Sequence, residues 1–271
     1  MSLAARSLLR PLFKLLMLLL VALLSLQLYF VGRIALMAVL APESTAFQRS
    51  EIFRVANTTG SLQWRQNWVP YAQISVNLKR AVITSEDASF TEHDGLDLEA
   101  LEKAWGKNVA AEQRAQKLAD RLAADAAKRQ SSKKTSSAAP PQKLVAKAPK
   151  VIGGSTITQQ LAKNLFLSGE RTLLRKGEEL VLTLMLEAML NKQRILEIYL
   201  NNVEWGEGIF GAEAAAQHYF RKPAARLSPY EAARLAVMLP RPRYFETRPN
   251  SDYLASRANT IVARMGSVVV P

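Results

Sequence analysis

Two adjacent acids are the first candidates for acid and base chemistry. Glu86 and Asp87 follow a stretch with apolar residues at three- and four-residue spacing, and Phe90 comes shortly after them. Partial burial beside apolar side chains would raise the pKa of a carboxyl group and suit it to general acid or base work. The alternative is a helix-terminal acid exposed to water, and the spacing alone leaves both readings open.

A second candidate is a group of charges further along the chain. Four cations within 14 residues are followed at once by two acids: Lys163, Arg171, Arg175, Lys176, Glu178 and Glu179. Arginine forks match phosphate oxygens and lysine supplies a point charge, so this group is suited to holding a phosphate. A solvated surface of salt bridges is the alternative.

Three other patterns carry less weight. The glycines of 206–211 match the dinucleotide string G-x-G-x-x-G, but the segment before them reads as a helix and not as a strand, which predicts a tight connection between helices. Ser131-x-x-Lys134 lacks the partner motifs of a penicillin-binding transpeptidase. His93 and His218 have no HExxH context, and His93 is better suited to orienting a neighbouring group.

Composition limits the chemistry further. The chain has 271 residues, 49% of them hydrophobic and 22% charged, which is typical of a folded protein of one large or two small domains. With no cysteine there is no disulfide, thiolate metal site or cysteine nucleophile, and two histidines leave little for a zinc centre. Any metal must therefore bind oxygen ligands.

The net charge of +13 is concentrated in two segments. Residues 1–42 carry four cations and no acid, and residues 107–150 carry 11 cations against three acids. The other 185 residues have 21 cations and 20 acids, so the folded part is almost neutral. This distribution argues against a nucleic-acid-binding domain.

An uncharged, leucine-rich stretch at 15–32 is just long enough to cross a bilayer. Arg6, Arg10 and Lys14 precede it, so the positive-inside rule places residues 1–14 in the cytoplasm and the bulk of the chain outside. A cleaved signal peptide is the alternative. We favour a retained transmembrane helix, because the apolar run exceeds the usual signal length and no clean A-x-A site follows it.

The remaining pattern is helical. Apolar spacing predicts helices over 70–82, about 179–190 and through 195–199, a further one begins after Gly153-Gly154 with Ser155 as N-cap, and Ser228-x-x-Glu231 is a capping box for a helix ending at Met238. On the helix after Ser155, a polar arc contains Thr156, Gln159, Gln160 and Lys163. No segment shows convincing strand alternation, so we expect a mainly α fold.

Residues 107–150 interrupt this pattern. They are rich in Ala, Lys, Gln and Ser, contain a Pro-Pro pair and have few large apolar residues. We expect an insert that is an exposed helix in its first half and disordered in its second.

Five segments together resemble a known family. They are EDASFTEHDG (86–95), GGSTITQQLAKN (153–164), RTLLRKGEE (171–179), KQRILEIYLNNVEWG (192–206) and LPRPRYF (239–245). In this order they are similar to the motif regions of the peptidoglycan polymerases of glycosyltransferase family 51, and most similar to its monofunctional members. The resemblance covers about residues 50–265 apart from the insert, and the GGSTITQQ string is highly specific.

The resemblance implies a lysozyme-like, mostly helical glycosyltransferase domain over 43–271 that polymerises lipid II on the periplasmic side of a bacterial inner membrane. The 4-hydroxyl of an acceptor sugar would attack C1 of the growing donor and expel undecaprenyl diphosphate with inversion. Such chemistry needs a base for the hydroxyl proton and positive charge for the leaving diphosphate.

The resemblance also assigns roles to residues. Glu86 matches the general base, and Glu179 matches a glutamate near the donor diphosphate. Lys163 and Arg171 match phosphate-contacting cations, supported by Arg175 and Lys176. The remaining candidates for substrate contact are Gln159, Gln160, Asn164, Phe90 and His93. No organic cofactor is implied, although a divalent cation, Mg²⁺ or Mn²⁺, is allowed at Glu179.

The implied partners are lipid II, the undecaprenyl-diphosphate-linked glycan, the inner membrane and other cell-wall synthesis proteins, with no nucleic acid. The insert and Glu178, which stands where some relatives have a basic residue, depart from the family pattern. Two alternatives stay open: a lysozyme-like or lytic hydrolase of finished peptidoglycan, and a membrane-tethered scaffold that binds anionic lipid or nucleic acid through the insert.

Overall fold

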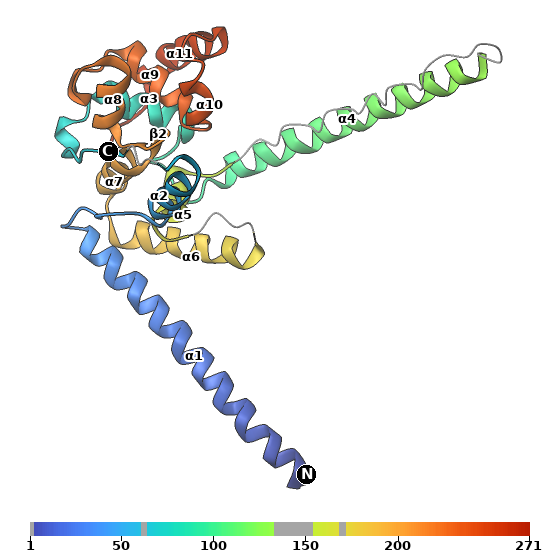
Figure 1. Ribbon diagram of the computed structural model, residues 1–271, viewed down its shortest axis with the longest axis vertical. Helices are drawn as coiled ribbons and strands as arrows, with labels where there is room; N and C mark the ends of the chain where they lie inside the picture. The colour runs from blue at the N-terminus through green and yellow to red at the C-terminus, as the bar shows by residue number, and fades with distance from the viewer. Residues whose placement is uncertain (1–2, 61–63, 133–153, 168–171) are drawn as a thin grey trace. The chain divides into compact units, whose positions relative to one another are not determined.

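The computed structural model describes residues 3–60, 64–132, 154–167 and 172–271. Contacts divide the chain into two compact units, one formed by 1–96 together with 156–271 and the other by 97–155. The first unit is mainly helical (Figure 1), which confirms the mainly α expectation. Its α-helices are α1 (Leu3–Met37), α2 (Ala46–Thr59), α3 (Val76–Glu86), α5 (Ile157–Phe166), α6 (Leu173–Met189), α7 (Lys192–Asn202), α8 (Ala212–Phe220), α9 (Pro229–Met238), α10 (Pro242–Glu246) and α11 (Asp252–Arg264). Short 3-10 turns lie at Tyr71–Gln73, Ala224–Arg226 and Met265–Ser267.

A small sheet corrects one expectation. β1 (Arg65–Gln66), β2 (Glu204–Gly206) and β3 (Ile209–Phe210) form a three-stranded sheet in the order β1-β3-β2. The glycines of 206–211 therefore turn a β2–β3 hairpin and do not connect two helices directly. Gly211 has φ +84, and a Cβ there would lie 2.6 Å from the carbonyl oxygen of Asn201, so only glycine fits. Strands of two or three residues are too short to show alternation in the sequence.

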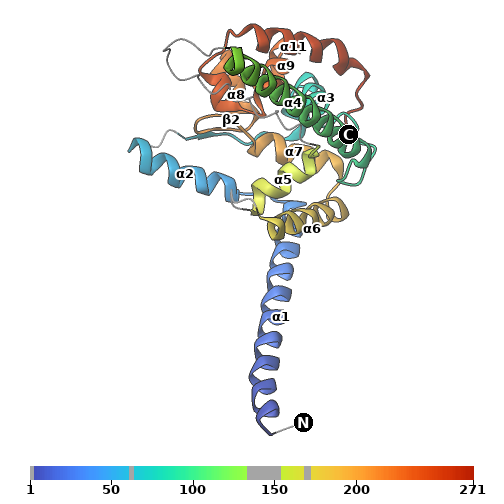
Figure 2. The ribbon, with the colours of Figure 1, turned by 90° about the vertical axis from the view of Figure 1, so that its right-hand side faces the viewer.

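α1 is, within the described part of the chain, the one helix long and apolar enough to cross a membrane, over Arg10–Met37. Most of this stretch is exposed, as expected of a span, but its C-terminal end packs on the rest of the first unit. Phe30, Ile34 and Met37 are buried there, and the ring of Phe30 meets that of Phe166 edge-on at 5.3 Å. Figure 2 shows α6 lying across this end of α1, with α5 beside it.

Capping residues fix where the helices begin. The N-cap of α5 is Thr156 and not Ser155, because Thr156 and Gln159 form a reciprocal capping box. The expected box of Ser228 and Glu231 does start α9. α3 begins at an N-cap serine, Ser75, after a short 3-10 turn, so the region expected as one helix over 70–82 is divided in two.

Several residues of the 192–206 and 239–245 segments are structural. Asn201 accepts from Val69 N and donates to Val69 O at 2.9 and 3.0 Å, which ties the segment after β1 to α7. Arg243 forms ion pairs with Glu204 at 2.8 Å and with Glu51, which ties α10 to β2 and α2. These segments therefore hold the body of the first unit together.

The second unit is built around α4 (Leu98–Ser132). This helix begins before the expected insert and continues to Ser132, so 107–132 is helical and the insert is not disordered as a whole. Residues 133–150, the part expected to be disordered, lie outside the described residues.

Candidate active site

Glu86 is the last residue of α3 and lies half-buried at the end of that helix. One carboxyl oxygen accepts a hydrogen bond from Nε2 of Gln160 on α5 at 3.1 Å, and the other accepts from Oγ of Ser85 at 3.4 Å. The hydroxyl of Tyr199 on α7 donates to Oε1 of Gln160 at 2.9 Å, so the amide of Gln160 is oriented with its NH₂ group toward Glu86. Three helices therefore define the position of this carboxyl group.

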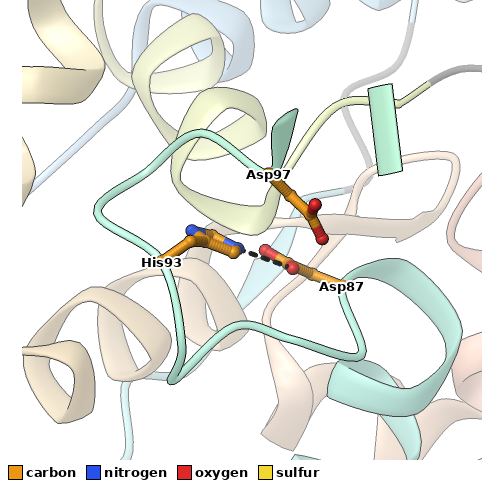
Figure 3. Close-up of side chains that lie close together, drawn as sticks. All are labelled: Asp87, His93 and Asp97. Carbon is orange, nitrogen blue, oxygen red and sulfur yellow. Dashed lines mark hydrogen bonds and ion pairs between the residues drawn. The ribbon is translucent and has the colours of Figure 1, made fainter. Parts of the chain in front are cut away.

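Asp87, beside it, is buried and has both oxygens engaged. The side chains of Asp87 and His93 point toward each other (Figure 3), with His93 Nε2 at 2.9 Å from Oδ1. Oδ2 accepts from the backbone N–H of Ile157, the first residue of α5, at 2.9 Å. Asp87 thus binds a helix N-terminus, where negative charge is favoured. Asp87 is thus buried and ties the loop after α3 to α5, whereas Glu86 is only half-buried and accepts hydrogen bonds from two side chains.

The contacts of His93 assign its tautomer. Gly95 N–H donates to Nδ1 at 3.1 Å, so Nδ1 is an acceptor and Nε2 carries the proton that is donated to Asp87. The neutral ring satisfies both contacts, and a proton on Nδ1 would oppose the Gly95 N–H. His93 thus orients Asp87, as the sequence suggested.

The loop after α3 is also pinned to α5 and α6. Thr156 Oγ1 donates to Gly95 O at 2.7 Å. Gly95 has φ +86, and a Cβ there would lie 2.7 Å from Cγ2 of Thr183 and 2.9 Å from Cγ of Glu187, both on α6. This close approach explains why glycine closes the 86–95 segment.

Burial and neighbouring charges shift the pKa of Glu86. Burial raises the pKa of Glu86, and the charge of Asp87 raises it further, whereas the hydrogen bonds from Gln160 and Ser85 and the charge of Arg257 lower it. Together these contributions raise the pKa of Glu86 above its ordinary value. Burial together with the charges of Glu86 and Asp87 raises the pKa of Tyr199 well above its ordinary value, so its hydroxyl stays protonated as a donor.

A second charged group lies at the start of α6. Glu179 is buried, forms an ion pair with Lys176, and has Oε2 3.7 Å from Nη1 of Arg175. Nε and Nη1 of Arg175 are buried without a hydrogen-bond partner in the part of the chain that the structure describes. Buried guanidinium donors without acceptors are costly, so this group is suited to receiving an anion.

The other predicted site residues divide between exposed and structural positions. Lys163 is exposed and Asn164 half-buried on α5, which packs against α6. Arg171 lies outside the described residues. Gln159 completes the capping box of α5, so its amide already has a structural partner. Phe90 is fully buried, which corrects the expectation that it contacts substrate: it is a core residue with Lys192 Nζ 4.6 Å from its ring centre.

Sequence reasoning missed other members of this region. Tyr199 counted only as an apolar position of its helix, although a buried tyrosine hydroxyl usually needs a partner and signals a polar contact. Lys192 donates to Glu187 at 2.8 Å and to His93 O at 2.5 Å, and Thr158 donates to the same oxygen of Glu187 at 2.6 Å. This network holds the loop that follows α3, which contains His93, against α6 and α7.

The surroundings of Glu179 do not fit a resident divalent cation. Mg²⁺ in proteins is bound through carboxylates and substrate phosphates. Here Lys176 and Arg175 lie against the two oxygens of Glu179 and already supply positive charge.

Comparison with known proteins identifies the family of the chain. The sequence profile described as Transglycosylase matches residues 54–139 and 134–266, two stretches that meet within the insert. The chain is 48% identical over 245 residues to the biosynthetic peptidoglycan transglycosylase of Burkholderia thailandensis, covering 90% of this chain and 82% of that protein. It is 47% identical to the protein of the same name from Herminiimonas arsenicoxydans, covering 90% of each chain. Because the profile covers more than half of the chain and these relatives match 90% of it, the chain belongs to the transglycosylase family.

Proposed function

We propose that this protein is a peptidoglycan glycosyltransferase that polymerises lipid II and releases undecaprenyl diphosphate. The observation that carries the proposal is the carboxyl group of Glu86, which accepts from Gln160, itself oriented by Tyr199, and whose pKa is raised by burial. A base of this kind can accept a sugar hydroxyl proton near neutral pH.

In the proposed reaction, Glu86 takes the proton of the acceptor 4-hydroxyl as that oxygen attacks C1 of the donor sugar. The new C1–O bond forms on the face opposite the leaving group, so the configuration at C1 inverts. The bond between C1 and the diphosphate oxygen breaks, and its electron pair leaves with undecaprenyl diphosphate. A positioned base contributes about 10²–10⁴-fold to the rate.

The departing diphosphate is assigned to the cations of α5 and α6. Arg175 supports this assignment because two of its buried nitrogens have no hydrogen-bond partner in the described chain, and phosphate oxygens would satisfy them. Lys163 and Lys176 add positive charge where negative charge develops, and the family resemblance assigns Arg171, outside the described residues, the same part. Glu179 holds Lys176 and Arg175 in place, so no step here requires a metal ion.

The apolar part of α1 provides the anchor in this proposal. Its flanking cations support an orientation with residues 1–14 in the cytoplasm and the catalytic unit on the periplasmic side of the inner membrane. Substrate and leaving product are both lipids, so a tethered enzyme meets them in two dimensions. Other cell-wall synthesis proteins are proposed partners on the same membrane.

The test is incubation of the purified full-length chain with labelled lipid II. Glycan polymer made by the wild-type chain and nearly lost in Glu86→Gln supports the proposal. Breakdown of isolated sacculi without polymer would instead identify a hydrolase. If the chain shows neither activity, the membrane-tethered scaffold is the remaining alternative.

A further inference from the structure

The C-terminal end of the membrane helix α1 is fastened to the catalytic unit by one side chain. Arg194 on α7 donates from Nε to the carbonyl oxygen of Met37 and from Nη2 to that of Leu40, both at 2.7 Å. Met37 is the last residue of α1. The last carbonyls of a helix have no partner inside it, and positive charge is favoured at that end. Arg194 therefore caps α1 from another helix.

Arg194 is itself held in place. Its Nη1 donates to Glu197 Oε2 at 2.6 Å, and the other oxygen of Glu197 accepts from the N–H of Tyr71 at 3.0 Å. The guanidinium also lies 5.5 Å from the ring centre of Trp68. All three guanidinium nitrogens are engaged and the side chain is only 16% exposed. An arginine fixed in this way defines a geometry, which a flexible surface cation does not.

The same helix carries the contact that orients the base. Tyr199 lies five residues after Arg194 on α7, and its hydroxyl donates to Gln160, whose amide donates to Glu86. The path from the end of α1 to the catalytic carboxyl thus runs through one rigid helix and two side-chain hydrogen bonds.

We propose that Arg194 is a positioning residue that fixes the exit point of the membrane anchor to α7 and thereby sets the height of Glu86 above the bilayer. The inference rests on the proposed function, because the reacting diphosphate of a lipid substrate lies at a fixed depth in the membrane. A displacement of about 1 Å can cost about 10²-fold in rate, so the height of the site matters.

The test compares Arg194→Ala with wild type on lipid II in two settings, a bilayer and detergent micelles. In the bilayer the anchor sets the height at which the catalytic unit meets lipid II. We therefore expect the rate of Arg194→Ala to be lower than that of wild type by about tenfold or more. In micelles the substrate can meet the cleft at any height, and we expect similar rates for the two proteins. Arg194→Lys keeps the charge but cannot span both carbonyls and Glu197, so its bilayer rate should lie between the two.

The matched control is Arg54→Ala. Arg54 also makes two ion pairs, with Glu51 at 2.7 Å and Glu207 at 2.8 Å, but does not touch α1. The Arg54→Ala variant should therefore keep the wild-type ratio of the rate in bilayers to the rate in micelles. An Arg194→Ala ratio equal to wild type, or an Arg54→Ala ratio that falls equally, would overturn the proposal.

A direct measurement of height separates this inference from the function. The chain has no cysteine, so Ala225→Cys, at an exposed position, gives a single dye site for energy transfer to acceptors in the bilayer. Arg194→Ala should broaden the distribution of dye-to-bilayer distances, and an unchanged distribution would contradict the proposal. If wild type makes no polymer in either setting, the proposed function fails. The distance measurement still tests whether Arg194 fixes the end of α1 to α7.

Discussion

Replacement of Glu86 by glutamine is the sharpest test of the site, because it removes the base and keeps its shape. The amide oxygen of Glu86→Gln can still accept from Gln160, whose orientation is set by Tyr199, and its NH₂ group can donate to the hydroxyl of Ser85. The variant should therefore bind substrate and fold normally. Its turnover should fall by about 10²–10⁴-fold, the usual contribution of a positioned base.

Stability provides the control within the same experiment. The pKa of Glu86 is raised in the folded state, so the folded protein binds its proton more tightly than the unfolded chain does. Stability then falls as pH rises from the unfolded pKa of about 4.3 through the folded one, because ionisation opposes burial. Glu86→Gln removes this cost, so its Tm relative to wild type should be more favourable at pH 7 than at pH 4.

The assays are lipid II polymerisation and thermal unfolding at both pH values. The acidic limb of the wild-type pH–rate profile should lie above the ordinary pKa of glutamate, because the base must be ionised. Nearly normal turnover of Glu86→Gln would refute the reasoning. A Tm lower by several degrees at both pH values would mean that the amide loses its two hydrogen bonds, each worth about 1 kcal/mol or about 2–4 °C in a protein of this size.

Four further outcomes test the surrounding structure. Tyr199→Phe should cost about 1 kcal/mol of stability and move the acidic limb of the pH–rate profile upward, because Gln160 is then free to turn away from Glu86; an unmoved limb would deny Tyr199 this role. Gly95→Ala should lower the unfolding free energy by at least about 1 kcal/mol, since its Cβ meets Thr183 and Glu187, whereas Gly106→Ala, with open space around it, should be neutral or stabilising. Deletion of 107–150 should leave most of the turnover measured on lipid II, and complete loss would assign the insert a catalytic part. A chelator should leave polymerisation largely intact because Lys176 and Arg175 already neutralise Glu179, and a loss that only Mg²⁺ or Mn²⁺ restores would place a metal there.

Local signals in the sequence were enough for several elements. The capping box of Ser228 and Glu231 predicted the start of α9, because both partners lie within one turn. The N-cap of α5 was displaced by one residue, since Ser155 and Thr156 are both good N-caps and only the reciprocal bond of Gln159 decides between them. Glu86 was identified as a candidate because an acid beside apolar residues is a local pattern.

Contacts between distant segments could not be predicted in this way. Arg194 and Met37 are 157 positions apart, and Gln160 and Glu86 are 74 apart. Neither pairing leaves a trace in local spacing. Phe90 illustrates the same limit: an aromatic beside two acids suits a cleft or a core equally, and only the packing shows that it is fully buried.

The packing of α3 has a consequence for how the protein is made. α3 lies against α9 and α11, which come much later in the chain. Long-range contacts of this kind form late and slowly, because the intervening chain must first be brought together. The packing around α3, the helix that ends at Glu86, therefore cannot be completed until α9 and α11 have been synthesised.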